Sequence, residues 1–164
     1  MGAAGDPHDL QRFVAAQQPV MAQAMAELGA GQKRSHWMWF VFPQLRVLGR
    51  SETARHYGLA SADEALAYWR HPLLGPRLRQ CTQVVLGVDG RSLQQIFGTT
   101  DALKFCSSMT LFEQVAPQEP VFALALQKYC HGQRDRLTLD GLQSQRDSDA
   151  SSTKPATLPA PAKP

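Results

Sequence analysis

Apolar residues repeat at helical spacing through most of the chain, and this repeat limits the fold more than any other feature. In residues 9–29 and 101–112, apolar side chains recur three or four positions apart, which places them on one face of a helix. Proline and glycine divide the pattern into short segments, because proline starts or stops a helix and glycine often follows its last turn. The sequence therefore predicts an all-α fold, a compact single-domain bundle of about six to eight helices.

The expected helices follow from where this spacing begins and ends. Ser61 and Ser92 each stand three residues before Glu64 or Gln95, which is the arrangement of a helix-capping box. Pro19 falls inside the first apolar pattern and splits it into two helices. The helices are expected at about 9–17, 19–29, 61–70, 74–86, 92–97, 101–112, 120–130 and 136–142.

The segment Trp37–Phe42 is apolar on every side, so its period does not separate a buried strand from a buried helix. Its aromatic content favours a strand. No other segment offers a clear partner strand, and an unpaired strand would leave backbone polar groups unsatisfied. A buried helix over about 34–42, ended near Pro43, is expected, and a strand is the alternative.

The composition divides the chain into three parts. Residues 143–164 are rich in Ser, Gln, Ala, Pro and Lys, and Leu158 is their one large apolar residue, so burial cannot offset the entropy of ordering them. We expect a flexible N-terminus over 1–8, a helical domain over 9–142 and a disordered tail over 143–164.

Charge and cysteine content limit the compartment and the partners. The net charge of +3 comes without a basic stripe or tail, which argues against nucleic-acid binding. No apolar run is long enough to predict a membrane span. Cys81, Cys106 and Cys130 are odd in number and widely spaced, which predicts reduced thiols and a cytoplasmic location. No spacing typical of a metal site or a cofactor motif occurs, so neither group is expected.

Residues 33–36 place two cations, a hydroxyl and an imidazole next to one another. If a helix begins here, its free amides together with Lys33 and Arg34 form an anion site, with Ser35 as a further ligand or as the helix cap. An imidazole side chain can act as an acid or a base near neutral pH, so His36 is the candidate general acid/base. The alternatives are a solvated helix start and a hydrogen-bonded structural histidine, because no carboxylate that would orient the ring lies nearby in the sequence.

The aromatic residues that follow have two interpretations. Trp37 and Trp39 are either core residues or rings that stack on a base or a sugar. Gln44, after Pro43, either binds a ligand through its amide or caps a turn.

A second polar cluster falls in the helix expected from residue 101. Lys104, Ser107 and Ser108 share a face opposite to the apolar one, and Thr110 lies close to them. A lysine with neighbouring hydroxyls can bind an oxyanion. A solvated helix face explains the same pattern.

Several long motifs resemble the DUF1810 family of small bacterial proteins. The motifs are Asp9-Leu-Gln-Arg-Phe13, Lys33-Arg-Ser-His-Trp-Met-Trp-Phe-Val-Phe-Pro-Gln44, Leu48-Gly-Arg-Ser51, His71-Pro-Leu-Leu-Gly-Pro-Arg-Leu78, Ile96-Phe-Gly98 and Asp101-Ala-Leu-Lys-Phe-Cys-Ser-Ser-Met-Thr-Leu-Phe112. The resemblance covers about 9–142 and implies a compact, mainly helical domain. It brings no activity with it. Some members carry the name calpastatin, but calpain inhibition is associated with disordered repeats rather than with an aromatic core.

Two functions follow as hypotheses. In the first, the segments 33–44 and 104–110 converge on one pocket that binds a small anionic ligand, such as a nucleotide or an ADP-ribose-like molecule. If this protein is an enzyme, His36 would serve hydrolysis or group transfer. In the second, the aromatic residues are core and the surface is a non-catalytic module that binds a protein partner.

Overall fold

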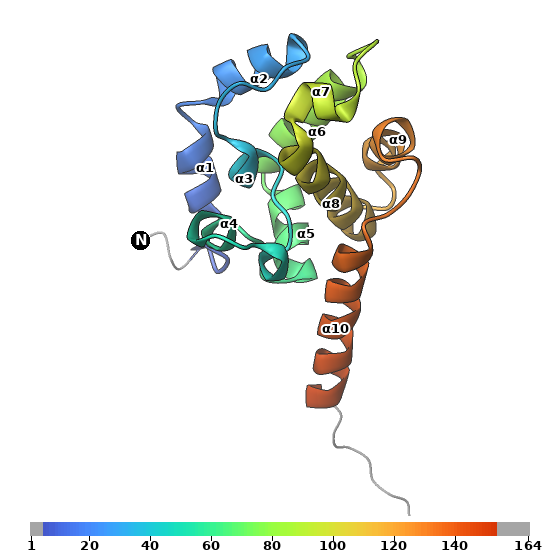
Figure 1. The fold of residues 1–164 in the computed structure, drawn as a ribbon. Coiled ribbons are helices and arrows are strands. Elements are labelled where there is room, and N and C mark those ends of the chain that lie inside the picture. The colour runs from blue at the N-terminus through green and yellow to red at the C-terminus, as the bar shows by residue number, and fades with distance from the viewer. Residues whose placement is uncertain (1–4, 154–164) are drawn as a thin grey trace, which may run out of the picture.

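The computed structural model describes residues 5–153, and within them the chain forms ten α-helices and no β-strand (Figure 1). The all-α prediction is confirmed, with more helices than the six to eight expected. The elements are α1 (Gln11–Gln17), α2 (Met21–Gly29), α3 (Met38–Val41), the 3₁₀ helix η2 (Arg46–Leu48), α4 (Glu52–His56), α5 (Ala62–Arg70), α6 (Leu74–Leu86), α7 (Leu93–Phe97), α8 (Thr99–Val115), α9 (Pro120–Tyr129) and α10 (Arg136–Thr153).

The helices predicted to begin at Ser61 and Ser92 do begin there, each with the serine as N-cap. The Ser61 hydroxyl accepts the Glu64 amide at the start of α5. At α7 the Ser92 hydroxyl accepts the Gln95 amide, while the Gln95 side chain accepts the Ser92 amide, so both bonds of the capping box form. These caps satisfy amides that the first helical turn leaves free.

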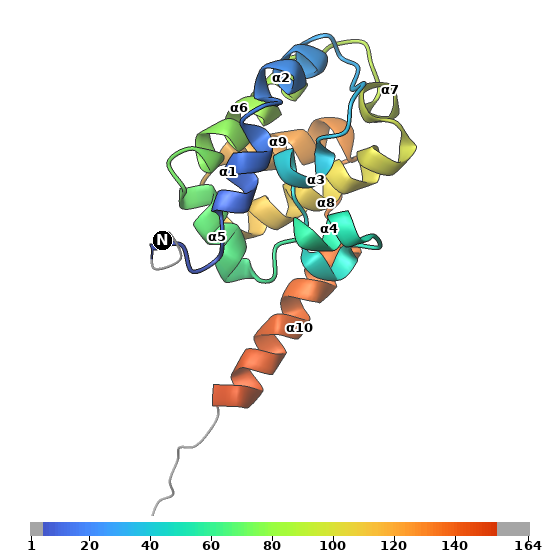
Figure 2. The same cartoon turned by 90° about the vertical axis from the view of Figure 1, so that its left-hand side faces the viewer.

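Helix α8 is the centre of the fold, and α5, α7 and α9 pack against it (Figures 1 and 2). Its apolar face buries Phe105, Met109 and Phe112 completely. The Phe105 ring lies 5.2 Å from that of Phe42 and 5.0 Å from that of Phe97, between ring centroids. Phe42 ends the segment Trp37–Phe42, called the Trp-rich segment from here on, and these contacts anchor that segment to the middle of α8.

The Trp-rich segment forms a much shorter helix than expected. Only α3, Met38–Val41, is helical. Ser35 and His36 form a bend and residues 34 and 37 have no regular structure, so the predicted helix over 34–42 is wrong in its first turn. The strand alternative is wrong as well. The one β-type pairing among the described residues is an isolated bridge between Leu45 and Leu59.

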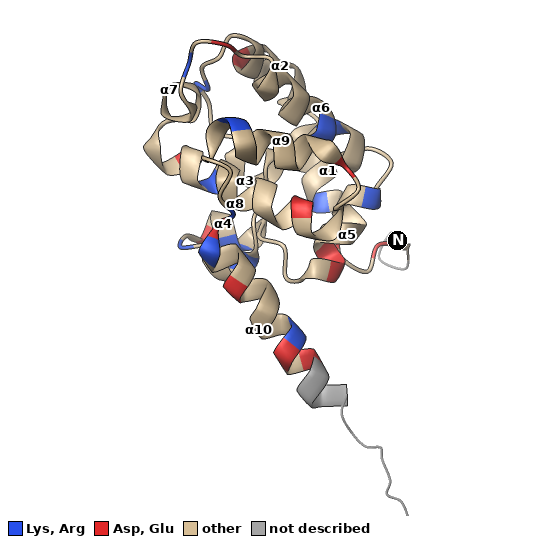
Figure 3. Ribbon diagram, turned by 90° about the vertical axis from the view of Figure 1, so that its right-hand side faces the viewer, with Lys and Arg blue, Asp and Glu red and all other residues tan. Residues whose placement is uncertain are grey.

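Helix α10 continues past the expected end of the domain to Thr153. Leu142 is buried, and the Gln145 side chain bonds both the Ala60 carbonyl (2.8 Å) and the Ala62 amide (3.2 Å) at the start of α5. These contacts order residues beyond 142, which composition alone assigned to the tail. The far end of α10 projects from the body, with acidic and basic residues along it (Figure 3). The flexibility predicted for residues 1–4 and the disorder predicted for 154–164 lie outside the described residues.

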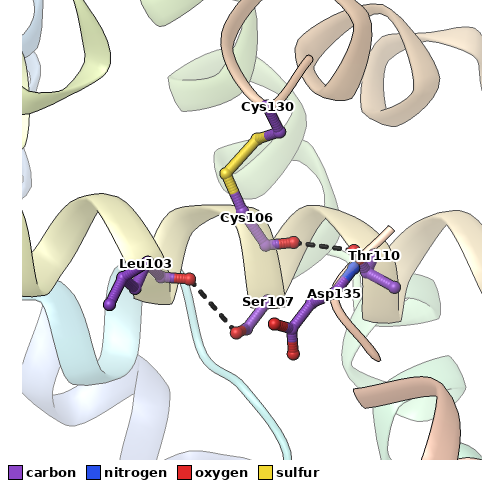
Figure 4. Close-up of a disulfide and its surroundings, with 6 residues drawn as sticks. All are labelled: Leu103, Cys106, Ser107, Thr110, Cys130 and Asp135. Carbon is purple, nitrogen blue, oxygen red and sulfur yellow. Dashed lines mark hydrogen bonds between the residues drawn. A yellow bond between two sulfur atoms is a disulfide. The ribbon is translucent and has the colours of Figure 1, made fainter. Parts of the chain in front are cut away.

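Two of the three cysteines are paired. Cys106 on α8 and Cys130 at the end of α9 form a disulfide, with their Cα atoms 6.1 Å apart (Figure 4). The prediction of reduced thiols is therefore wrong for this pair, and Cys81 is a free, buried thiol. The two partners are 24 residues apart, and only the packing of α9 on α8 brings them together.

Candidate functional site

The predicted site segment is organised by Glu27, a buried acid on α2 that is 7% exposed. Its carboxylate accepts hydrogen bonds from the Arg34 amide (2.9 Å), the Ser35 amide (3.1 Å) and the Ser35 hydroxyl (2.7 Å). It also accepts the Trp37 indole N–H (2.8 Å) and the Gln23 side-chain amide (3.0 Å). The free amides at 34 and 35, predicted to bind an external anion, are therefore occupied by this internal carboxylate.

Sequence reasoning missed Glu27, although a signal was present. Its neighbours Ala24 and Leu28 are fully buried positions on the inner face of α2. A charged residue beside the apolar stripe of a helix must be paired or hydrogen-bonded, because an uncompensated buried charge is costly. Glu27 could have been singled out on that ground.

The hydrogen bonds to Glu27 make its contribution to stability depend on pH. Burial alone would raise the pKa of this carboxyl, but the bonds from Arg34, Ser35 and Trp37 outweigh burial and lower the pKa from 4.5 to about 2. Because the folded pKa is depressed, the stabilisation is complete above about pH 5 and is lost as the pH falls through 4.5 towards 2.

We expect urea unfolding at pH 6, 4 and 3 to show a falling free energy of unfolding, and Glu27→Gln to remove part of that fall. An identical pH dependence in the wild type and in Glu27→Gln would contradict this account.

The two predicted polar clusters meet at Asp101, in the first turn of α8. The Lys33 ammonium lies 2.8 Å from one Asp101 oxygen, and the Lys104 ammonium lies 3.8 Å from the other. Each lysine also lies near an indole ring, Lys33 at 5.2 Å from Trp37 and Lys104 at 5.9 Å from Trp39. Asp101 therefore neutralises much of the charge expected to attract an anion.

The candidate general acid/base lies at the surface. His36 is exposed and its ring centroid lies 6.4 Å from that of Trp39, which is half-buried. Within residues 5–153 the His36 ring makes no hydrogen bond or ion pair, so no carboxylate orients it there. Arg34 is exposed and donates to the Gln32 side chain at 3.1 Å. A catalytic role for His36 stays a prediction.

Two of the three hydroxyls on α8 that were predicted to bind a ligand are bonded to the protein itself (Figure 4). Ser107 donates to the Leu103 carbonyl at 3.1 Å. Thr110 donates to the Cys106 carbonyl at 2.8 Å and accepts the Asp135 amide at 2.9 Å, which joins α8 to the start of α10. Ser108 is fully buried, and its hydroxyl has no hydrogen-bond partner among the described residues.

An open groove of about 890 Å³ lies between the segment 44–54, α8 and the first half of α10. Of the predicted ligand-binding residues, three line it: Gln44, Lys104 and Ser107. The predicted residues that do not line it are Lys33, Arg34, Ser35, His36, Trp37, Trp39, Ser108 and Thr110. The groove has no aromatic side chain in its lining.

Three large apolar side chains stand exposed in this groove. They come from three separate elements: Val47 of η2 is 71% exposed, Leu103 of α8 is 68% exposed and Leu137 of α10 is 61% exposed. Among the described residues, five large hydrophobic side chains are exposed, and the other two, Leu73 and Leu124, lie outside the groove. An exposed apolar patch of this kind is typical of an interaction surface.

These features define a small all-α protein with an open apolar groove beside its central helix. The family described as "Protein of unknown function (DUF1810)" matches residues 7–142, and the chain belongs to this family. It is similar to the crystal structure of the conserved hypothetical protein Rv1873 from Mycobacterium tuberculosis. The two share 54% sequence identity and a TM-score of 0.83, over 84% of this chain and 99% of that one. No functionally curated protein matches the chain.

Within residues 5–153, no helix has the length and hydropathy needed to cross a membrane. In the same part of the chain, no three His, Cys, Asp or Glu side chains are grouped so that they could hold a metal ion.

Proposed function

We propose that this protein is a non-catalytic binding module, and that its groove takes a peptide segment of a partner protein with apolar side chains and an acidic residue. The observation that carries the proposal is the convergence of Val47, Leu103 and Leu137 on one groove. Burying side chains this exposed would contribute about 1–2 kcal/mol each to binding.

Charge in and around the groove favours an acidic partner. Arg50 is exposed, and its side chain has no hydrogen bond or ion pair within residues 5–153. Lys104 shares Asp101 with the closer Lys33 and is only partly compensated. On the opposite wall, Asp140 already pairs with Arg136 at 3.3 Å. Asp135, the other acid in the lining, accepts the Thr138 amide and hydroxyl at 3.0 and 2.6 Å. Arg50 is therefore the charged side chain of the lining that has no hydrogen bond or ion pair within residues 5–153, and an acidic side chain of a partner complements it.

A nucleotide or ADP-ribose-like ligand is less well supported in this place. A base needs an aromatic face on which to stack, and no aromatic residue lines the groove. Trp37 is fully buried and its indole N–H is held by Glu27. Lys104, 3.8 Å from Asp101, remains partly available for the acidic group of a peptide.

A peptide-display selection tests the proposal. We expect a library of random 12-residue peptides, selected on the wild-type protein, to yield sequences that are rich in Leu, Ile, Phe and Val and contain Asp or Glu. Leu103→Glu should weaken binding of these peptides at least about tenfold, because it places a charge where an apolar side chain is buried. Leu124→Glu is the matched control, since Leu124 is 54% exposed on α9 and lies outside the groove.

Charge reversal at Arg50 sharpens the test. A selection repeated on Arg50→Glu should yield peptides with Lys or Arg in place of the acid. The proposal fails if no peptide is enriched, if Leu103→Glu and Leu124→Glu bind equally well, or if Arg50→Glu leaves the acidic preference unchanged.

A further inference from the structure

A second hollow, of about 620 Å³, lies where the N-terminal residues meet α4 and the start of α5. It shares no lining residue with the groove. Basic side chains dominate its wall: Arg12, Arg46, Arg55, His8 and His56. The acids in the lining are Asp9 and Glu64. Neither predicted polar cluster contributes to it.

Arg12 holds the wall of this hollow together through its hydrogen bonds. Its guanidinium donates to four backbone carbonyls, those of His8 (2.7 Å), Asp9 (2.8 Å), His56 (2.9 Å) and Gly58 (3.2 Å). It also donates to the Glu64 carboxylate at 2.8 Å. These five acceptors occupy the Arg12 guanidinium, and the Glu64 carboxylate balances its positive charge. The same bonds join the N-terminal residues to the loop after α4 and to α5, so the wall is held in place before any ligand arrives.

The backbones of the other two arginines, Arg46 and Arg55, are anchored, while their side chains are free to bind a ligand. The Arg46 amide donates to the Leu59 carbonyl at 2.8 Å, and Gly58 lies so close that a Cβ there would come within 2.4 Å of the Arg46 Cα atom. Arg55 is held in the last turn of α4. Both side chains are exposed, and within residues 5–153 neither makes a hydrogen bond or an ion pair.

The charges do not balance within the hollow. Once Arg12 and Glu64 cancel, Arg46 and Arg55 face a single acid, Asp9. The nearby Asp6 does not compensate them, because its two oxygens accept the Leu10 and Gln11 amides at 2.7 and 2.9 Å at the start of α1. Two arginines against one acid leave an excess of one positive charge, which an anionic ligand would offset.

We propose that this hollow binds the phosphoryl group of a small phosphorylated metabolite between Arg46 and Arg55. A guanidinium presents a planar fork of N–H donors that matches two oxygens of one phosphate, which a lysine cannot do. The imidazoles of His8 and His56, which line the same hollow, add further donors. A volume of about 620 Å³ suits a small ligand rather than a macromolecule.

Titration of the ¹⁵N-labelled full chain tests the site, with inorganic phosphate and glucose 6-phosphate as probes. We expect saturable amide shifts at residues 7–12, 46 and 55–60, and tighter binding of the sugar phosphate. Arg46→Gln/Arg55→Gln should raise both dissociation constants at least about tenfold, because two bidentate partners are lost. Arg34→Gln/Arg70→Gln is the matched control, since it removes the same charge from two exposed arginines outside both the hollow and the groove.

Three results would overturn the proposal. The first is the absence of saturable shifts at these residues with either probe at 20 mM. The second is equal weakening by the two double variants, which would indicate attraction by net charge alone. The third is equal affinity for the two probes, which would exclude recognition of a metabolite. Because the hollow and the groove share no lining residue, Leu103→Glu should leave these titrations unchanged.

Discussion

We expect the Glu27→Ala variant to lose about 4 kcal/mol of unfolding free energy, a large fraction of the stability of a domain of this size. The change removes the acceptor for the Arg34 and Ser35 amides and for the Trp37 indole N–H. Trp37 is fully buried, so its N–H would remain without a partner in the core. An unsatisfied buried donor costs about 1–3 kcal/mol, and bonds to a charged acceptor are the stronger ones.

Urea unfolding followed by tryptophan fluorescence measures this loss. Glu27→Gln should fall between the wild type and Glu27→Ala, because an amide keeps one acceptor oxygen. Asp140→Ala is the control, since Asp140 pairs with Arg136 at an exposed i,i+4 position and such pairs contribute about 0.5 kcal/mol. A loss below 1 kcal/mol in Glu27→Ala would show that the carboxylate does not hold the 33–37 segment.

The second large effect concerns the disulfide. Replacing both Cys106 and Cys130 with serine is expected to lower the unfolding free energy by about 3 kcal/mol, because the cross-link closes a loop of 24 residues in the unfolded chain. The chain after Cys130 leads to Asp135, whose amide donates a hydrogen bond to the Thr110 hydroxyl. Because this connection would be less restrained without the disulfide, the start of α10 should exchange its amide hydrogens faster in the variant.

Dithiothreitol provides the matched comparison. Reduction should bring the wild-type midpoint in urea down towards that of the double variant and leave the double variant unchanged. An identical wild-type midpoint with and without reductant, together with three free thiols by mass spectrometry after alkylation, would contradict the pairing.

The parts of the fold that the sequence predicted depend on neighbours along the chain. The capping boxes expected at Ser61 and Ser92 connect residues three positions apart. The box at Ser92 forms both bonds, whereas at Ser61 the hydroxyl accepts the Glu64 amide and the Glu64 carboxylate accepts the Ala60 amide instead. Pro19 separates the first two helices, as expected. The first turn of the helix expected over 34–42 failed for the opposite reason. Its amides are taken by Glu27, seven and eight positions earlier and on another helix.

The sequence predicted only part of the candidate site, because most of its contacts join residues far apart along the chain. Proximity of the 33–36 and 104–108 clusters was expected, and Lys33 and Lys104 do meet at Asp101. Their neutralisation by that acid has no local signature. The groove joins Val47, Leu103 and Leu137, which lie in three elements, and only the packing of those elements places them together. The disulfide between Cys106 and Cys130 depends on packing in the same way.

We propose that this chain binds its partner in the groove and not at the Trp-rich segment. The most direct test is an amide chemical-shift map of the ¹⁵N-labelled protein, titrated with the tightest peptide from the display selection. The account predicts that the largest shifts fall in residues 44–54, 100–107 and 135–144, with little change at 33–37. Largest shifts at 33–39, with the groove residues unmoved, would contradict it.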